Sequence, residues 1–135
     1  MNREKIREKT MQLIYQMDIS DEFDVSELKL MEEDSNILGK KQADDTLGAV
    51  KEHISEIDEA IKANLDKWSF ERIAKTDHAI LRTAVAEMLY IDYIPSAVSI
   101  NEAVELSKKY GEEKSYKFVN SVLGKIEKSL ENKSE

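Results

Sequence analysis

The clearest candidate for chemistry in this 135-residue sequence is a basic face on its last predicted helix, near residues 112–130. At 100° per residue, one side of that helix carries four lysines around a single aromatic ring, and no acid. Its members are Lys114, Lys117, Phe118, Ser121, Lys125 and Lys128. Lysines neutralise phosphates and a ring stacks on an unpaired base, so the face suits single-stranded nucleic acid. The alternative stays open: Phe118 packs under a neighbouring helix and the lysines only solubilise.

The first predicted helix, Arg3 to Ile19, offers a second face of similar chemistry. A row at i, i+4 spacing consists of Arg3, Arg7, Met11 and Tyr15. Two arginines and a tyrosine are able to bind phosphate and stack on a base. Lys5 and Lys9 add positive charge nearby, while Glu4 and Glu8 dilute it. A tyrosine half-buried at the edge of a helix is the common alternative.

Residues for catalysis or metal binding are scarce. The sequence has no cysteine, and its histidines, His53 and His78, have no second ligand at metal spacing. It has no phosphate-binding loop, dinucleotide fingerprint or hydrolase motif. The acidic pair Asp44 and Asp45 lacks the spacing of a calcium loop. We therefore expect no enzyme activity, no catalytic residue, no metal and no cofactor, with both histidines at the surface.

The elements that position these faces are all helical. Four glycines, one proline and abundant Glu, Lys, Leu, Ile and Ala predict an all-α protein of six to seven helices. Apolar stripes at helical spacing predict long helices near 3–19, 43–66, 76–91 and 112–130, with a shorter one built on Val25, Leu28, Leu30 and Met31. We expect two packed subdomains, residues 1–67 and 68–135.

Local signals predict where several helices begin and end. Thr76 is the expected N-cap of the helix that Pro95 follows, with Asp77 in its first turn. Ser99 and Glu102 have the spacing of a capping box and are expected to begin the next helix. Gly111 is expected to end that helix.

Charge is distributed unevenly along the chain. The net charge is −8, yet residues 21–66 alone carry fourteen acidic and five basic side chains, and residues 108–128 carry six basic and three acidic ones. The acidic middle supports a different hypothesis, a helical protein-interaction module that meets a basic partner without binding RNA. No apolar run is long enough to span a membrane, and the charged N-terminus is no signal peptide, so we expect a cytoplasmic protein.

From Pro95 onward the sequence resembles the NusB family of transcription antitermination factors. The resemblance rests on P-S-A-V-S-I-N-E-A-V-E-L and K-F-V-N-S-V-L, supported by D-H-A-I-L-R-T-A-V-A-E-M and by R-E-K-T-M-Q-L-I-Y at residues 7–15. It covers both ends and most of the C-terminal half, whereas residues 20–66 match only in length and helical character. It implies two three-helix bundles.

The resemblance also implies partners and site residues. Members of the family bind the boxA element of ribosomal RNA transcripts together with NusE, a small-subunit ribosomal protein, and help RNA polymerase elongation complexes pass terminators. By position, the RNA-binding residues would be Arg3, Lys5, Arg7, Gln12, Tyr15, Tyr110, Lys114, Lys117 and Phe118. Asp77 falls where the family meets NusE. A homodimer that hides the RNA face is an alternative to a monomer.

Overall fold

The computed structural model describes residues 1–27 and 35–134, and within these ranges every regular element is helical. The α-helices are α1 (Arg3–Ser20), α2 (Lys41–Lys62), α3 (Lys75–Tyr90), α4 (Ser96–Tyr110) and α5 (Ser115–Ser134). Single 3-10 turns lie at η1 (Val25–Glu27), η2 (Ser35–Ile37) and η3 (Phe70–Arg72). The all-α prediction is confirmed. The predicted count was too high, because η1 and η3 are single turns; Leu28, Leu30 and Met31 lie outside the described residues.

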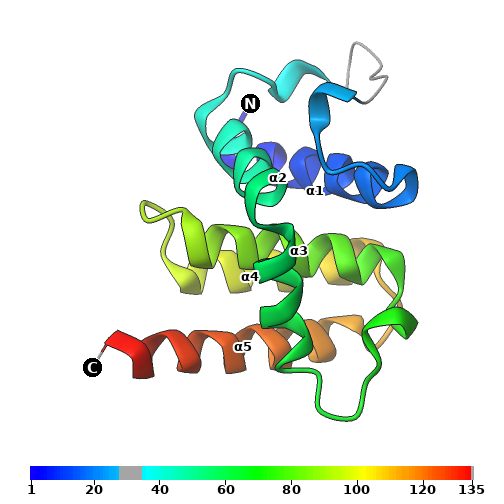
Figure 1. Cartoon of the computed structure of the whole chain (residues 1–135), viewed down its shortest axis with the longest axis vertical. Helices are drawn as coiled ribbons and strands as arrows, with labels where there is room; N and C mark the ends of the chain where they lie inside the picture. Colours follow the sequence, from blue (N-terminus) through cyan, green and yellow to red (C-terminus); the bar gives the residue numbers. More distant parts are fainter. Residues whose placement is uncertain (28–34, 135) are drawn as a thin grey trace.

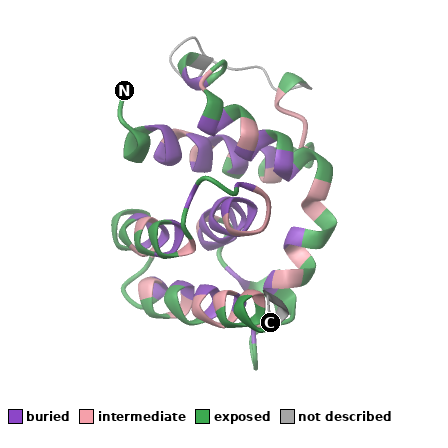
Figure 2. Cartoon of the chain, turned by 90° about the vertical axis from the view of Figure 1, so that its left-hand side faces the viewer, coloured by how far each residue is buried: buried purple, intermediate pink, exposed green. Residues whose placement is uncertain are grey.

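The helices are arranged around α3. This helix contacts α1, α2, α4 and α5, while α2 runs across the other helices as Figure 1 shows. Figure 2 shows α3 buried around most of its circumference, in keeping with buried positions throughout 77–87. A helix that is buried on all sides forms the centre of a domain. The expected subdomain boundary at residues 67 and 68 falls in the connection between α2 and η3.

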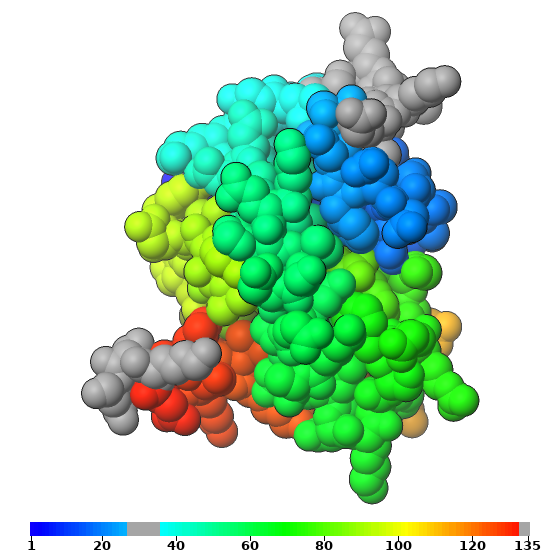
Figure 3. All heavy atoms as spheres, viewed as in Figure 1, coloured from blue at the N-terminus to red at the C-terminus, as the bar shows by residue number. Residues whose placement is uncertain are grey.

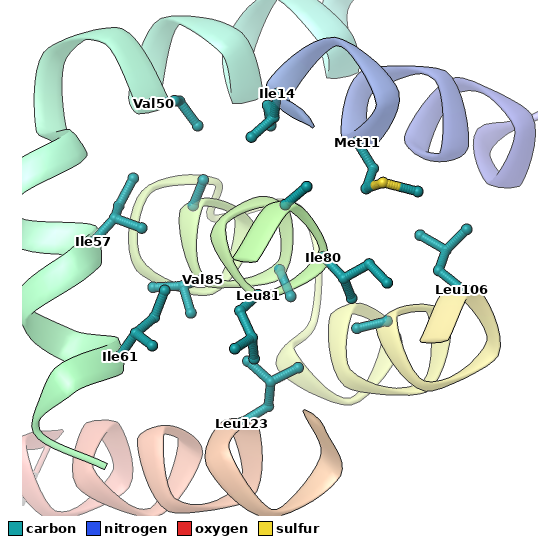
Figure 4. Close-up of a cluster of buried hydrophobic side chains, with 14 of the residues drawn as sticks. Met11, Ile14, Val50, Ile57, Ile61, Ile80, Leu81, Val85, Leu106 and Leu123 are labelled. Atoms are coloured by element: carbon teal, nitrogen blue, oxygen red, sulfur yellow. The ribbon is translucent and has the colours of Figure 1, made fainter. Parts of the chain in front are cut away.

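The core receives aliphatic side chains from all five helices. Figure 4 shows them converging on α3: Ile14 from α1, Val50 and Ile57 from α2, Leu81 and Val85 from α3, Leu106 from α4 and Leu123 from α5. Burying each such side chain contributes about 1.5–3 kcal/mol. The apolar stripes read from the sequence are therefore the faces that pack.

Two predicted helix starts were wrong. Helix α3 begins at Lys75 after Ala74, one residue before the predicted cap Thr76. Helix α4 begins at Ser96, directly after Pro95, because the fixed φ of proline (−62°) already suits the start of a helix. Ser99 is therefore inside α4, where its hydroxyl donates to Glu87 Oε1 (2.8 Å) instead of capping the backbone.

Gly111 follows the last residue of α4, as predicted, but for a steric reason. Its φ is −88°, so the position does not need a left-handed backbone. A Cβ there would lie 2.6 Å from Ser115 Cβ and 2.7 Å from the carbonyl oxygen of Ser107. The missing side chain lets the chain turn tightly from α4 into α5, which sets how Tyr110 and Lys114 are presented on either side of the turn.

Candidate nucleic-acid interface

A hollow between α1 and α4, which we call the α1–α4 hollow, collects polar and aromatic side chains from both helices. Its volume is about 400 Å³, and its lining consists of Met11, Gln12, Tyr15, Gln16, Thr76 and Tyr110. Gln12 Nε2 donates to the Tyr110 hydroxyl (3.0 Å), while the Tyr15 ring is exposed. Gln12, Tyr15 and Tyr110 all belong to the predicted RNA set. Tyr110 follows the other two by about 95 positions in sequence, yet all three line the same hollow.

Glu8 lies at the edge of this hollow and is the centre of a charged cluster. Its Oε2 accepts hydrogen bonds from Lys109 Nζ and from the Tyr110 hydroxyl (2.9 Å). Its Oε1 accepts from Lys5 Nζ (2.7 Å). Lys109 and then Lys5 lower the pKa of Glu8 to about 2, although its burial opposes that shift. The carboxylate therefore stays ionised and holds two exposed lysines from different helices beside it.

A second concavity, the α3–α5 groove, lies between the starts of α3 and α5. Its volume is about 540 Å³, and it is lined by Trp68, Arg72, Ile73, Ala74, Asp77, Glu112, Glu113, Lys114, Ser115 and Phe118. Trp68 is 63% exposed, and its ring meets the edge of the half-buried Phe118 ring with centroids 5.8 Å apart. Figure 3 shows the connection after α2, residues 63–69, projecting at the lower edge of the molecule.

Asp77 lies on the floor of the α3–α5 groove and is only 7% exposed. Its Oδ2 accepts a hydrogen bond from the Ser115 hydroxyl (3.2 Å), whereas Oδ1 has no hydrogen-bond partner among the described residues. Burial raises the pKa of Asp77 above its ordinary value, against the effect of Ser115. A buried carboxylate oxygen without a donor is costly, so the groove favours a ligand that brings one.

The hollow and the groove are neighbours. Thr76 lines the hollow and Asp77 lines the groove, so the two concavities flank the start of α3. Lys114 and Lys117 are exposed beside Phe118 on α5, and Lys117 Nζ also lies 5.9 Å from the centre of the Tyr116 ring. The Phe118 ring packs against the core, as one alternative expected, and it also lines the groove.

Arg3 and Arg7 do not join this surface. Arg3 is exposed at the start of α1 but lines neither concavity. Arg7 is 4% exposed, and its Nε and Nη2 donate to the two carboxylate oxygens of Glu87 (2.8 and 3.1 Å). The expectation that Arg7 is presented to RNA is corrected, because this pair anchors α1 to the central helix. Met11 in the same row is also buried.

The structure also shows where the two histidines and Lys125 lie. His78, expected at the surface, is buried with Nε2 against the carbonyl oxygen of Phe70 (2.7 Å), and burial lowers its pKa. His53 is partly exposed and stacks on the Tyr90 ring with centroids 4.0 Å apart. On α5, Lys125 is paired with Asp66. The charge of Lys125 is therefore compensated by a carboxylate, so the basic face of α5 has less uncompensated positive charge than helical geometry alone predicted.

Sequence reasoning missed Trp68 and Lys109 as members of the surface. A large aromatic residue in a short polar connection was a usable signal for Trp68, since such residues are usually buried in a helix or at an interface. Lys109 precedes Tyr110 and gave no separate signal. The described part of the chain contains no group of three or more potential metal ligands, and no described helix is long and apolar enough to cross a membrane.

Comparisons with known proteins point to one family. A model of the NusB family matches residues 4–128. The transcription antitermination protein NusB of Oceanobacillus iheyensis is 45% identical over 130 residues, which cover 93% of this chain and 98% of that protein.

Solved structures show the same fold. NusB of T. maritima superposes with a TM-score of 0.77 at 33% identity, over 95% of this chain and 92% of that chain. A structure of the antitermination factors NusB and NusE in complex with double-stranded RNA matches with a TM-score of 0.69 at 28% identity, over 94% and 96% of the two chains.

Proposed function

The chain belongs to the NusB family of transcription antitermination proteins, and on that premise we propose that it binds boxA-type single-stranded RNA together with NusE. In this proposal it works in the transcription elongation complex on ribosomal RNA transcripts, and therefore in the cytoplasm. The relatives are named as antitermination proteins and not as enzymes. One solved relative is a complex of NusB and NusE with double-stranded RNA, which supports NusE and RNA as partners, while the proposed preference for a single strand rests on the residues of this chain.

The observation that carries the RNA proposal is the Phe118 ring. It is half-buried, so it is held rigidly by the core, yet it lines an open groove with the exposed cations Lys114 and Lys117 beside it. A fixed ring next to phosphate-binding lysines is the arrangement that stacks on an unpaired base. Duplex RNA keeps its bases stacked and hidden, which favours a single strand as the ligand.

The α1–α4 hollow extends the proposed path of the strand past α3. Tyr15 offers a second exposed ring, and Gln12 and Tyr110 offer hydrogen-bonding groups at the edge of the hollow. Lys5 and Lys109 add positive charge there. We therefore place the RNA along the hollow and α5, with Arg7 excluded because its guanidinium is buried against Glu87.

The part of the α3–α5 groove around Trp68 and Asp77 is the proposed docking site for NusE, and Phe118 lies at its border with the proposed RNA path. The buried Asp77 Oδ1 has no donor within the described part of the chain, and a backbone N–H or basic side chain of a partner protein would supply one. Trp68 adds a large exposed ring at the rim of the groove, a residue type that dominates protein interfaces. RNA and partner would then occupy adjacent surfaces and reinforce each other's binding.

Fluorescence anisotropy with a labelled boxA oligonucleotide, with and without NusE, tests this function. Phe118→Ala is expected to weaken RNA binding by about 1–3 kcal/mol because a stacking contact is lost. Tyr93→Ala is the matched control, since Tyr93 is an exposed ring at a distant groove, lined by Asp45 and His53. Equal RNA affinity of Phe118→Ala and wild type would contradict the proposal.

Two further measurements define the complex. The same oligonucleotide annealed to its complement is expected to bind more weakly, and equal binding would contradict the preference for a single strand. Light scattering on the same samples gives the mass. We expect one protein chain per RNA, and a dimer that dissociates as RNA binds would identify a homodimer that hides the RNA face.

A further inference from the structure

Glu8 is an acidic residue beside the proposed RNA surface, and its charge and its hydrogen bonds should have opposite effects on RNA binding. A carboxylate beside phosphate-binding lysines repels RNA, so charge alone predicts that its removal strengthens binding. Yet Glu8 is the residue on which this end of the surface is built. It is 6% exposed, and its two oxygens accept from Lys5 of α1, from Lys109 of α4 and from the Tyr110 hydroxyl.

The contacts of Glu8 fix side chains that otherwise have many conformations. Lys5 and Lys109 are long, exposed and flexible, and their order in the structure comes from the shared carboxylate. Tyr110 is fixed from two sides, because its hydroxyl donates to Glu8 and accepts from Gln12. One buried carboxylate thus orders three polar side chains directly, and Gln12 through Tyr110, beside the α1–α4 hollow.

We propose that Glu8 is a positioning residue for RNA and that Lys5 and Lys109 form a phosphate clamp around it, with the Tyr110 ring fixed beside them by the hydrogen bond of its hydroxyl to Glu8. An ammonium group has three N–H donors, so a lysine that donates one hydrogen bond to Glu8 still has others to donate to a phosphate oxygen. The conformational cost of ordering the lysines is met when the protein folds, and RNA binding no longer bears it. This inference rests on the proposed function.

Glu4 provides a matched control on the same helix. It lies one turn before Glu8, is exposed, and carries the same charge near the same surface. Glu4→Gln removes one exposed carboxylate from the proposed RNA surface, along with an acid in the first turn of α1 and a repulsion of Glu102. RNA affinity is expected to rise about twofold. Glu8→Gln removes the same charge but frees the clamp, and RNA affinity is expected to fall about 3- to 10-fold.

The salt dependence of binding separates positioning from a general loss of structure. If Glu8→Gln loses an ordered phosphate contact, the slope of log K against log salt becomes shallower by about 0.7 per contact. Lys109→Gln should show the same shallower slope, and it should have little further effect in the Glu8→Gln background because the two changes remove one contact. Lys109 is exposed, so its substitution leaves the fold intact.

The experiment measures anisotropy with the boxA oligonucleotide at several salt concentrations for wild type, Glu4→Gln, Glu8→Gln, Lys109→Gln and the double variant. Tighter RNA binding by Glu8→Gln, equal to that of Glu4→Gln, overturns the inference and makes Glu8 a repulsive charge. Unchanged binding and slope in Lys109→Gln also overturns it, even if Glu8→Gln folds poorly. If wild type binds no boxA RNA, the proposed function fails first, which distinguishes the two failures.

Discussion

The α1–α4 hollow and the α3–α5 groove flank the same helix start, yet their polar groups are in opposite states. Beside the hollow, Glu8 accepts from three donors, and the buried Glu87 of α3 accepts from Arg7 of α1 and from Ser99 of α4. In the groove, Asp77 keeps one oxygen without a partner among the described residues. The polar groups beside the hollow are thus already paired, whereas the groove holds a buried acceptor without a donor among the described residues.

This difference suggests a division of labour. An organised surface binds a flexible strand at low conformational cost, which suits the proposed RNA. An unsatisfied carboxylate and an exposed ring destabilise the free protein, and the docking of a partner is expected to remove this free-energy cost. Substitutions at the hollow should therefore change RNA binding, and substitutions in the groove should change NusE binding. Their effects on the stability of the free protein should also differ in sign.

The largest effect is expected from the buried Arg7–Glu87 pair between α1 and α3. Arg7→Ala leaves the Glu87 carboxylate without its cation in the core and should lower the free energy of unfolding by about 3–5 kcal/mol. Arg3→Ala, at an exposed position of the same helix, should change it by less than about 0.5 kcal/mol. Urea unfolding followed by circular dichroism measures both. A similar small loss in the two variants would show that Arg7 does not anchor α1.

The contrast between Arg7 and Tyr15 shows where sequence reasoning succeeds and where it stops. Helical periodicity places residues on a face, and it correctly predicted the buried stripe that includes Ile14 and Leu123. It also placed Tyr15 at the edge of that stripe, where the ring is exposed. It cannot show whether a cation at the edge of a face meets a carboxylate 80 positions away, as Arg7 meets Glu87.

Ser99 and Trp68 illustrate two other limits. The spacing of Ser99 and Glu102 fits a capping box, but the tertiary partner Glu87 outcompetes the backbone for the serine hydroxyl. Trp68 belongs to an irregular connection, where no period predicts orientation, so only the fold brings it to Phe118. The sequence predicted the long helices and their buried stripes, while long-range pairing decided which side chains remain exposed.

Trp68 provides the next largest effect and a direct test of the division between the regions. Trp68→Ala removes an exposed ring at the proposed docking groove and should weaken NusE binding by about 2 kcal/mol. Binding of RNA alone should change less than NusE binding, because Trp68 meets the proposed strand only through its contact with the Phe118 ring. Calorimetric titration with NusE and anisotropy with RNA measure the two affinities. An effect on RNA alone, with NusE binding unchanged, would assign the ring to the strand.

Asp77 should show the smaller effect of a group that is unfavourable in the free protein. Its pKa is raised by burial, so the folded state prefers the neutral acid and stability falls as pH rises through that pKa. Asp77→Asn should therefore raise Tm at neutral pH by about 2–4 °C, corresponding to about 1 kcal/mol, and weaken NusE binding.

Below about pH 4 both states of wild type hold the proton, so the difference in Tm between Asp77→Asn and wild type should disappear. Thermal unfolding from pH 3 to pH 8 measures it. A destabilised Asp77→Asn protein at neutral pH would mean that the carboxylate is satisfied in the free protein.

Glu8 should give the smallest effect on stability, with the opposite dependence on pH. Its pKa is lowered to about 2, so the stabilisation is present above the ordinary pKa of a glutamate and is lost as pH falls toward 2. Because Lys5 and Lys109 are exposed and solvent screens them, the contribution should stay below about 1 kcal/mol. Wild type should therefore exceed Glu8→Gln in Tm at pH 7, and the gap should close between about pH 5 and pH 2. A gap that widens on acidification, as for a group with a raised pKa, would remove the distinction between the organised hollow and the unsatisfied groove.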